Sequence, residues 1–302
     1  MSGARLDILG IGTLAVDDFL YVASYPPPDS KARVMRTARQ FGGLVGTGIA
    51  AAARLGARCG YGGVLGGDEL SRAARAAMER LGIEMTRLID RNGAGPLHSV
   101  IIVDDQTGSR NIFFDLAPMQ GLGAEDVPPE LIGSARVLFV DQLEMDGKIA
   151  ACHIAREIGV PVVADLEWTH DPRLEEFLGL IDHVIVSLHF AAEVTGASDP
   201  REAVRSLHLR HSRALTVVTC GVDGCWFVTG SSGEARHHPA RRCEVVETTG
   251  CGDVLHGAYA AALARGASVE QRIEFATAAA AVYASRPSGW DHLPTRSECG
   301  TY

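Results

Sequence analysis

The feature that most constrains the fold is a repeated alternation between β-rich segments and helical patterns. The β-rich segments include LDILGIG, RVLFVDQ, PVVADLEW, DHVIVSL and ALTVVTCG, and helical patterns such as GTGIAAAARLGA and GKIAACHIAREIG stand between them. Alternating strands and helices form βαβ units, in which helices cover both faces of a mostly parallel sheet. The sequence therefore predicts an α/β fold with three α/β/α layers, as a single domain over residues 1–302.

Two stretches interrupt this alternation. FLYVASY with ARVMRTARQF, and LHSVIIVDD with SRNIFFDL, have the pattern of antiparallel ribbons, and the second ribbon turns at DDQTGSR. We expect the ribbons to form a small antiparallel sheet, drawn from about residues 13–40 and 97–114, that covers one edge of the main domain.

The charge balance excludes two classes of partner. Lys and Arg number 28 against 37 Asp and Glu, a formal net charge of −9, whereas nucleic acids and anionic membranes bind basic surfaces. No apolar run is long enough to span a membrane, and the opening MSGARLDILGIG lacks the apolar core of a signal peptide. The 7 cysteines are scattered without a C-x-x-C pair, which indicates reduced thiols and a cytoplasmic location.

One motif suggests a dinucleotide site and is rejected. Gly10, Gly12 and Ala15 fit G-x-G-x-x-A after a strand. That pattern binds a pyrophosphate only where a helix begins, and here VDDFLYVASYPPP reads as a strand followed by a proline turn. The sequence also lacks G-x-x-x-x-G-K-[ST], so a P-loop is absent.

The stretch ETTGCGD, residues 247–253, precedes the alanine-rich helix VLHGAYAAAL. Main-chain N–H groups of Gly250, Cys251 and Gly252 would form a concave set of donors, and the helix dipole adds partial positive charge. Such a site suits an anion that develops during a reaction, such as a phosphoryl group in transfer. Asp253 could then align an attacking hydroxyl or accept its proton. These residues alone are equally compatible with a turn and a helix cap.

The stretch ETTGCGDVLHGAYAAALARG resembles the second signature of the ribokinase-like (PfkB) carbohydrate kinases, usually written D-T-x-G-A-G-D. GTLAVDDFLYV resembles the family's opening strand, in which Asp17 matches an aspartate that binds the sugar. FGGLVGTGIAAAARLGA resembles the sugar-binding turn and helix, with Gly42 and Gly43 as the two glycines.

The sequence also resembles the family's nucleotide-binding elements. VVTCGVDGCWF resembles the T-x-G-x-x-G element that holds ATP, with Thr219, Gly221 and Gly224 in the motif positions. FATAAAAVYASRPSG, which includes Thr277, resembles the helix that lies against the adenine. Within the family, SYPPPDSKARV and VDDQTGSRNIFF are most similar to ketohexokinase and the sulfofructose kinases.

The resemblance implies a ribokinase-like fold and ATP-dependent phosphorylation of a sugar hydroxyl with Mg²⁺. Asp253 would be the base, and Gly250, Cys251 and Gly252 the anion hole. The ribbons would be a lid that closes over the sugar, excludes water and forms a homodimer interface. Two alternatives remain open: a nucleoside kinase of the same superfamily, and a nucleotide-binding pseudokinase with a regulatory role.

Several positions depart from the family pattern. Cys251 replaces an alanine and places an oxidisable thiol beside the phosphates. Glu247 replaces the leading aspartate, which leaves a K⁺ requirement open. Ser187 and Phe190 occupy the ends of the family's N-x-x-E motif, so the metal ligands cannot be named and Ser187 is expected to touch phosphate instead.

Four further residues have an open role. Thr47 stands where relatives often have asparagine, and Asp29, in the PPPDS turn, is a second candidate for contact with the sugar. Because Leu44 replaces a common lysine, we expect Arg110 of the lid to bring positive charge to the phosphates; the alternative is a solvated ribbon charge. Asp165 follows the strand PVVA at the carboxyl end of the sheet, where open α/β sites lie, and its role is functional or structural.

Overall fold

The computed structural model describes residues 5–211, 213–231 and 233–300 and contains three sheets, one of which is large. The large sheet has eight strands in the order β14-β13-β12-β11-β10-β9-β1-β4. Strands β12 to β4 of that order run parallel, and β13 and β14 are antiparallel additions at one edge. The strands are β1 Leu6–Ile11, β4 Cys59–Tyr61, β9 Ala135–Asp141, β10 Val162–Leu166, β11 His183–Ser187, β12 Leu215–Thr219, β13 Cys225–Thr229 and β14 Arg236–His238.

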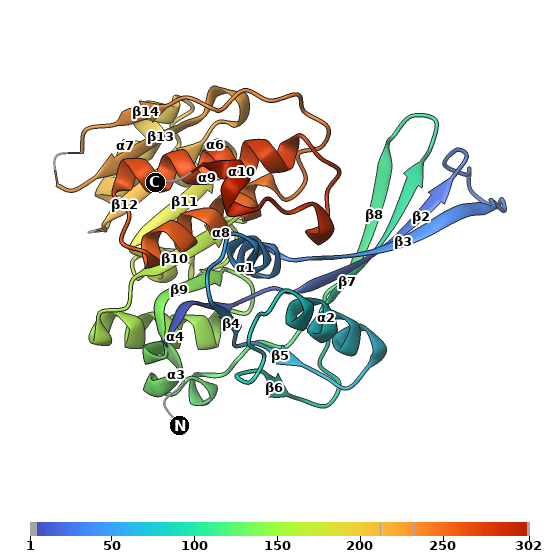
Figure 1. Ribbon diagram of the computed structural model, residues 1–302, viewed down its shortest axis with the longest axis horizontal. Helices are drawn as coiled ribbons and strands as arrows, with labels where there is room; N and C mark the ends of the chain where they lie inside the picture. Colours follow the sequence, from blue (N-terminus) through green and yellow to red (C-terminus); the bar gives the residue numbers. More distant parts are fainter. Residues whose placement is uncertain (1–4, 212, 232, 301–302) are drawn as a thin grey trace.

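Helices cover both faces of this sheet (Figure 1). Successive strand residues supply opposite faces: Ile8 and Phe139 belong to one apolar core, and Leu9 and Leu138 to the other. The first face carries α1 Leu44–Arg54, α2 Glu69–Arg80, α8 Cys251–Ala264 and α9 Val269–Ala284. The second carries α3 Pro129–Gly133, α4 Met145–Ile158, α5 Leu174–Leu178, α6 Leu188–Thr195 and α7 Pro200–Leu209. The predicted three-layer α/β fold is confirmed.

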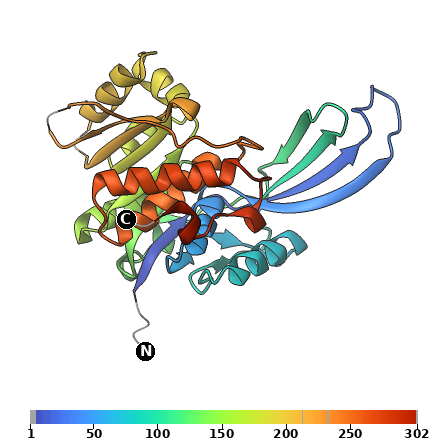
Figure 2. The same ribbon diagram turned by 45° about the horizontal axis from the view of Figure 1, so that its top comes forward.

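A four-stranded sheet projects from the main body, as Figures 1 and 2 both show. Its order is β3-β2-β7-β8, with β2 Ala15–Val22, β3 Val34–Gly42, β7 Leu97–Asp104 and β8 Arg110–Asp115. The pairs β2/β3 and β7/β8 are the antiparallel ribbons that the sequence predicts, and β2 and β7 join them in parallel. The short strands β5 Val64–Leu65 and β6 Ile89–Asp90 form the third sheet, and α10 Arg296–Cys299 lies near the chain end.

Helices α1 and α8 cross in close contact because glycine stands at the crossing. A Cβ atom at Gly257 would lie only 1.9 Å from the carbonyl oxygen of Gly48. The contact brings the N-terminus of α8 next to the first turns of α1, over the carboxyl ends of the parallel strands. Main-chain atoms of α1 and α8 therefore fix the relative position of these two helix N-termini.

Two exclusions from the sequence can be compared with the fold. After β1, the chain enters strand β2 rather than a helix, as the sequence predicts, so the G-x-G-x-x-A match lacks the helix N-terminus that a dinucleotide site requires. All 7 cysteines lie in the described part of the chain and are free thiols, as predicted. Among the described residues, no helix is long and apolar enough to cross a membrane.

Candidate active site

The N-terminus of α8 lies where the sequence predicts an anion site, and its unpaired main-chain donors differ from the predicted set at one residue. Gly250 is the N-cap residue in the left-handed region, with φ 82°. The N–H of Cys251 donates to the carbonyl oxygen of Thr248 at 3.1 Å and so is already engaged. The N–H groups of Gly250, Gly252 and Asp253 have no hydrogen-bond acceptor among the described residues. The free donors are thus those of Gly250, Gly252 and Asp253 rather than that of Cys251.

Asp253 lies in the first turn of α8 beside two other acidic side chains. Burial and the neighbouring carboxylates of Asp165 and Glu167 raise the pKa of Asp253 well above its ordinary value. A raised pKa makes this carboxylate a stronger proton acceptor once it is ionised. Burial also raises the pKa of the Cys251 thiol to about 11. The thiol is then protonated at neutral pH, which lowers the oxidation liability expected at this position.

A large cavity adjoins this helix N-terminus. It has a volume of about 510 Å³ and includes Cys251 and Gly252 at one side. Thr219, Gly221, Gly224 and Thr277, all predicted to bind nucleotide, line it together with Val222, Ala240, Arg241, Arg242, Cys243, Val245, Thr248, Leu255, Ala280, Ala281 and Ala284. The extended segment that contains Arg241 and Val245 was missed in the sequence because it carries no motif. The small apolar side chains and the size of the cavity fit an adenine nucleotide.

The hydroxyls of three predicted nucleotide-site residues serve the fold. Ser187 is the N-cap of α6, and its Oγ accepts from the N–H of Phe190 at 3.1 Å. Thr219 donates to the carbonyl oxygen of Val186 at 3.3 Å, and Thr277 donates to that of Ile273 at 2.9 Å. Phe190 itself is buried in the core. The structure therefore gives the Ser187 hydroxyl a capping role, and its contact with phosphate stays a prediction.

Asp17 and the two glycines meet at the base of the small sheet. A Cβ atom at Gly42 would lie 3.0 Å from Oδ2 of Asp17. Gly43 has φ 89°, and a Cβ there would lie 2.4 Å from the carbonyl oxygen of Thr13, so position 43 requires glycine, whereas a Cβ at position 42 would need only a small shift of the Asp17 carboxylate. Burial raises the pKa of Asp17. Helix α1 starts directly afterwards, and within it the Thr47 hydroxyl accepts from Nε1 of Trp290 at 3.3 Å.

Strand register places Asp17 on a defined face of the small sheet. Asp17 pairs with Ser99, and Ser99 pairs with Phe114, so these three side chains share one face. Arg110 lies on the same face, four residues before Phe114 on β8. By contrast, Asp29 is exposed in the turn between β2 and β3, at the tip of the small sheet that lies farthest from the main body (Figure 1).

Arg110 connects the small sheet to the segment before α8. Its guanidinium donates to Oε1 of Glu247 at 3.0 Å and to Oγ1 of Thr249 at 2.8 Å. The other carboxylate oxygen of Glu247 accepts from the N–H of Ser288 at 3.2 Å. A residue of the predicted lid thus reaches the stretch that carries the anion site.

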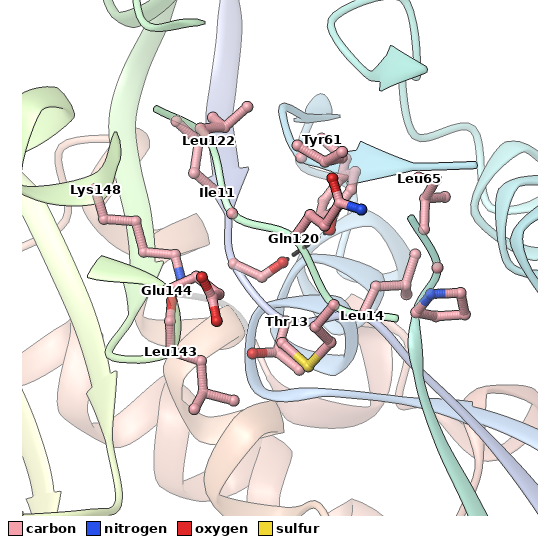
Figure 3. Close-up of a pocket in the computed structure, with 17 residues that line it drawn as sticks. Ile11, Thr13, Leu14, Tyr61, Leu65, Gln120, Leu122, Leu143, Glu144 and Lys148 are labelled. Carbon is pink, nitrogen blue, oxygen red and sulfur yellow. Dashed lines mark hydrogen bonds between the residues drawn. The ribbon is translucent and has the colours of Figure 1, made fainter. Parts of the chain in front are cut away.

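A smaller cavity, of about 40 Å³, with polar and apolar side chains in its lining, lies at the carboxyl end of β1 (Figure 3). Thr13, Gln120, Glu144 and Lys148 line it. The Lys148 ammonium binds the buried Asp141 carboxylate and the carbonyl oxygen of Leu143. Thr13 Oγ1 is buried without a hydrogen-bond partner among the described residues, and Glu144 adopts φ 52°. An orphaned hydroxyl and a non-glycine residue in this backbone region are typical of ligand-binding sites.

The sequence of the chain matches a known family. The profile described as pfkB family carbohydrate kinase matches residues 6–296, nearly the whole chain. The chain belongs to the pfkB family of carbohydrate kinases. It is 24% identical to the 5-dehydro-2-deoxygluconokinase of Shouchella clausii, with 98% of this chain and 95% of the relative covered.

Solved structures of the family share the fold. The ribokinase of Arabidopsis thaliana, complexed with ribose and ATP, superposes with a TM-score of 0.85 at 20% identity, covering 98% of this chain and 97% of that one. An E. coli protein described as a candidate ribokinase II, in complex with ATP and Mg²⁺, gives a TM-score of 0.83 at 18% identity, covering 97% of each chain. These structures show that the chain has the ribokinase-like fold, and the family match shows a carbohydrate kinase that phosphorylates a sugar-like substrate.

Proposed function

We propose that this carbohydrate kinase transfers the γ-phosphoryl group of ATP to a hydroxyl of a sugar or sugar acid, with Asp253 as the base. The position of Asp253 carries the proposal. It lies at the N-terminus of α8, between the 510 Å³ cavity and the helix α1 that follows Gly43. A nucleotide in that cavity and an acceptor beside Asp17 would meet there.

In this proposal the acceptor hydroxyl gives its proton to Asp253 while its oxygen bonds to the γ-phosphorus. The bond from that phosphorus to the bridging oxygen of the nucleotide breaks. The free N–H groups of Gly250, Gly252 and Asp253 stabilise the negative charge that passes through the site. Arg110 adds positive charge at the same segment when the small sheet, acting as a lid over residues 13–40 and 97–114, lies against it.

The proposed cofactor is ATP with Mg²⁺, and the metal neutralises phosphate charge when bound. The described residues include no group of three or more His, Cys, Asp or Glu side chains that could hold a metal ion. We therefore assign Mg²⁺ chiefly to the phosphates of ATP. Both carboxylate oxygens of Glu247 already have donors, so we assign no K⁺ site there, and activity with and without K⁺ tests that decision.

For the acceptor, we propose a keto-sugar or a keto-sugar acid. The relative named 5-dehydro-2-deoxygluconokinase favours the acid, while the SYPPPDSKARV and VDDQTGSRNIFF tracts favour ketoses and sulfo-sugars. The cavity in Figure 3 would bind the polar end of the acceptor, because the Thr13 hydroxyl there lacks a partner among the described residues. An ATP-consumption screen over ketoses, sugar acids, sulfo-sugars and nucleosides identifies the acceptor. Turnover of nucleosides alone would contradict the assignment of a keto-sugar or keto-sugar acid.

The role of Asp253 is tested by Asp253→Asn. We expect kcat to fall by at least ~10²-fold, because a general base typically contributes that much. ATP affinity, measured by calorimetry, should change little because the main-chain donors and the cavity remain. Turnover within a fewfold of the parental enzyme would contradict the assignment of Asp253 as the base.

We also propose a cytoplasmic homodimer formed through the small sheet. β8 is an edge strand, and Ile112, Phe113 and Phe114 on it are 53%, 54% and 65% exposed. Side chains alternate between faces, so the face that carries Phe113 points away from Asp17 and is available to a second copy. Sedimentation velocity at micromolar concentration should give a dimer, and a monomer at all concentrations would contradict this proposal.

A further inference from the structure

A cluster of titratable side chains lies beneath Asp253, where β10, β11 and α8 meet. Asp165 of β10 is 4% exposed, and its carboxyl group interacts electrostatically with that of Asp253, whose pKa it raises. Its Oδ2 atom lies 3.1 Å from Nδ1 of His256. The imidazole is not directed at this oxygen, which has no hydrogen-bond donor among the described residues. Asp165 is thus a buried acid placed between Asp253 and a histidine.

His256 is buried and is held by main-chain acceptors at both ring nitrogens. Nδ1 lies 2.8 Å from the carbonyl oxygen of Gly252, and Nε2 lies 2.8 Å from that of Ile185. A neutral imidazole has one N–H and can satisfy one of these carbonyls, whereas an imidazolium donates to both. The geometry therefore favours a positive charge on His256, although burial works against that charge by lowering the pKa of His256.

We infer that Asp165 and His256 are positioning residues that set, in opposite directions, the pH at which Asp253 becomes available as a base. The inference rests on the proposed role of Asp253. The Asp165 carboxylate is a negative charge next to Asp253, so it opposes ionisation of the base. The His256 imidazolium favours ionisation of both carboxyl groups.

Other titratable groups surround the pair but do not replace these two residues. Glu167 at the end of β10 adds negative charge. The Asp141 carboxylate of β9 is compensated by its ion pair with Lys148 of α4. The remaining groups are Cys251 of α8, Tyr283 of α9, and Glu247, which is paired with Arg110. All of them stay unchanged in the variants described next.

The test is the pH dependence of kcat/KM for Asp165→Asn and His256→Asn. In Asp165→Asn the acid limb should move to lower pH by about one unit or more, because a like charge next to Asp253 is removed. In His256→Asn it should move to higher pH, because a positive charge is lost. Unmoved limbs, or two shifts in the same direction, would overturn the inference.

Asp182→Asn is the matched control. Asp182 is a half-buried aspartate whose carboxylate accepts from the N–H of Val162 at 2.9 Å, at the amino end of the sheet. Burial also raises the pKa of Asp182. Its replacement should leave the acid limb of kcat/KM in place. A shift as large as that of Asp165→Asn would show a general effect of removing acidic charge and overturn the inference.

The protonation of His256 can also be measured on the parental protein, so this test does not depend on whether a variant folds. ¹⁵N spectra of the histidine rings, recorded across the pH range of the acid limb, should show both nitrogens of His256 protonated there, and a ring that stays neutral throughout that range would overturn its role. The two hypotheses can also fail separately. Activity in Asp253→Asn would refute the base, whereas an inactive Asp253→Asn with unmoved limbs in the other two variants would refute only the inference.

Discussion

The contact between α1 and α8 predicts a large effect of Gly257→Ala. A Cβ atom at residue 257 would lie 1.9 Å from the carbonyl oxygen and 2.7 Å from the carbonyl carbon of Gly48. Carbon–oxygen contacts below about 3 Å are strongly repulsive, and both partners are main-chain atoms, so no side-chain rotation relieves the overlap. The helices must separate by about 1 Å, or the helix must deform locally.

The magnitude follows from two opposing terms. Overpacking of this kind typically costs ~1–3 kcal/mol, and replacing glycine in a helix interior by alanine returns about 1 kcal/mol. Because the clash is between backbones, we expect a net loss of ~1–2 kcal/mol in the free energy of unfolding. A 1 Å displacement of Asp253 from the acceptor should lower kcat/KM by roughly 10²-fold.

Urea denaturation followed by circular dichroism, together with steady-state kinetics, measures both effects. Gly133→Ala in α3 is the control, because a Cβ there would meet only Cδ1 of Ile158, at an ordinary 3.7 Å. Parental stability and kinetics in Gly257→Ala would refute the close crossing of the helices. A loss of stability with parental kinetics would refute the argument that this crossing positions Asp253.

Two further substitutions separate main-chain from side-chain roles. Arg110→Ala should lower kcat/KM by roughly 10²-fold, equivalent to ~2.7 kcal/mol. The side chains of Arg110 and its ion-pair partner Glu247 are 42% and 29% exposed. The free energy of unfolding should therefore change by less than ~1 kcal/mol. Arg39→Ala, which removes an ion pair with Asp18 on the opposite face of the small sheet, is its control, and equal kinetic losses in the two variants would contradict the role of Arg110. Cys251→Ala should keep kcat within about threefold, because main-chain donors form the anion site, and a loss near 10²-fold would show that the thiol takes part.

The sequence predicts the elements of the fold well because their periodicity is local. The ribbons around FLYVASY and LHSVIIVDD are recognisable from alternation alone, and both form as predicted. Their parallel junction through β2 and β7 is not predictable in this way, because Ala15 pairs with Leu97, far away in the chain. Pairing at such a separation depends on the path of everything between the two strands.

In the candidate site, too, residues that belong to local motifs are predicted, whereas contacts that depend on the folded path of the chain are not. Gly42, Gly43 and Gly250 are predicted because they belong to sequence motifs, and Gly43 and Gly250 have the positive φ that favours glycine. Arg241 and Arg242 were missed because an extended loop without periodicity brings them to the nucleotide cavity. The engaged N–H of Cys251 could not be foreseen, since it depends on the turn that places the Thr248 carbonyl oxygen beside it.

The order of the strands has a consequence for synthesis on the ribosome. β1 occupies an interior position between β4 and β9, yet β9 begins at Ala135, well over a hundred residues after Leu6. At 5–20 residues per second, roughly 10 s pass before that partner is translated. Helix α8, which completes the core against α1, emerges later still. Nascent chains must therefore carry the apolar segments of β1 and α1 uncovered for much of translation, and dependence on chaperones should be greatest before residue 264 leaves the exit tunnel.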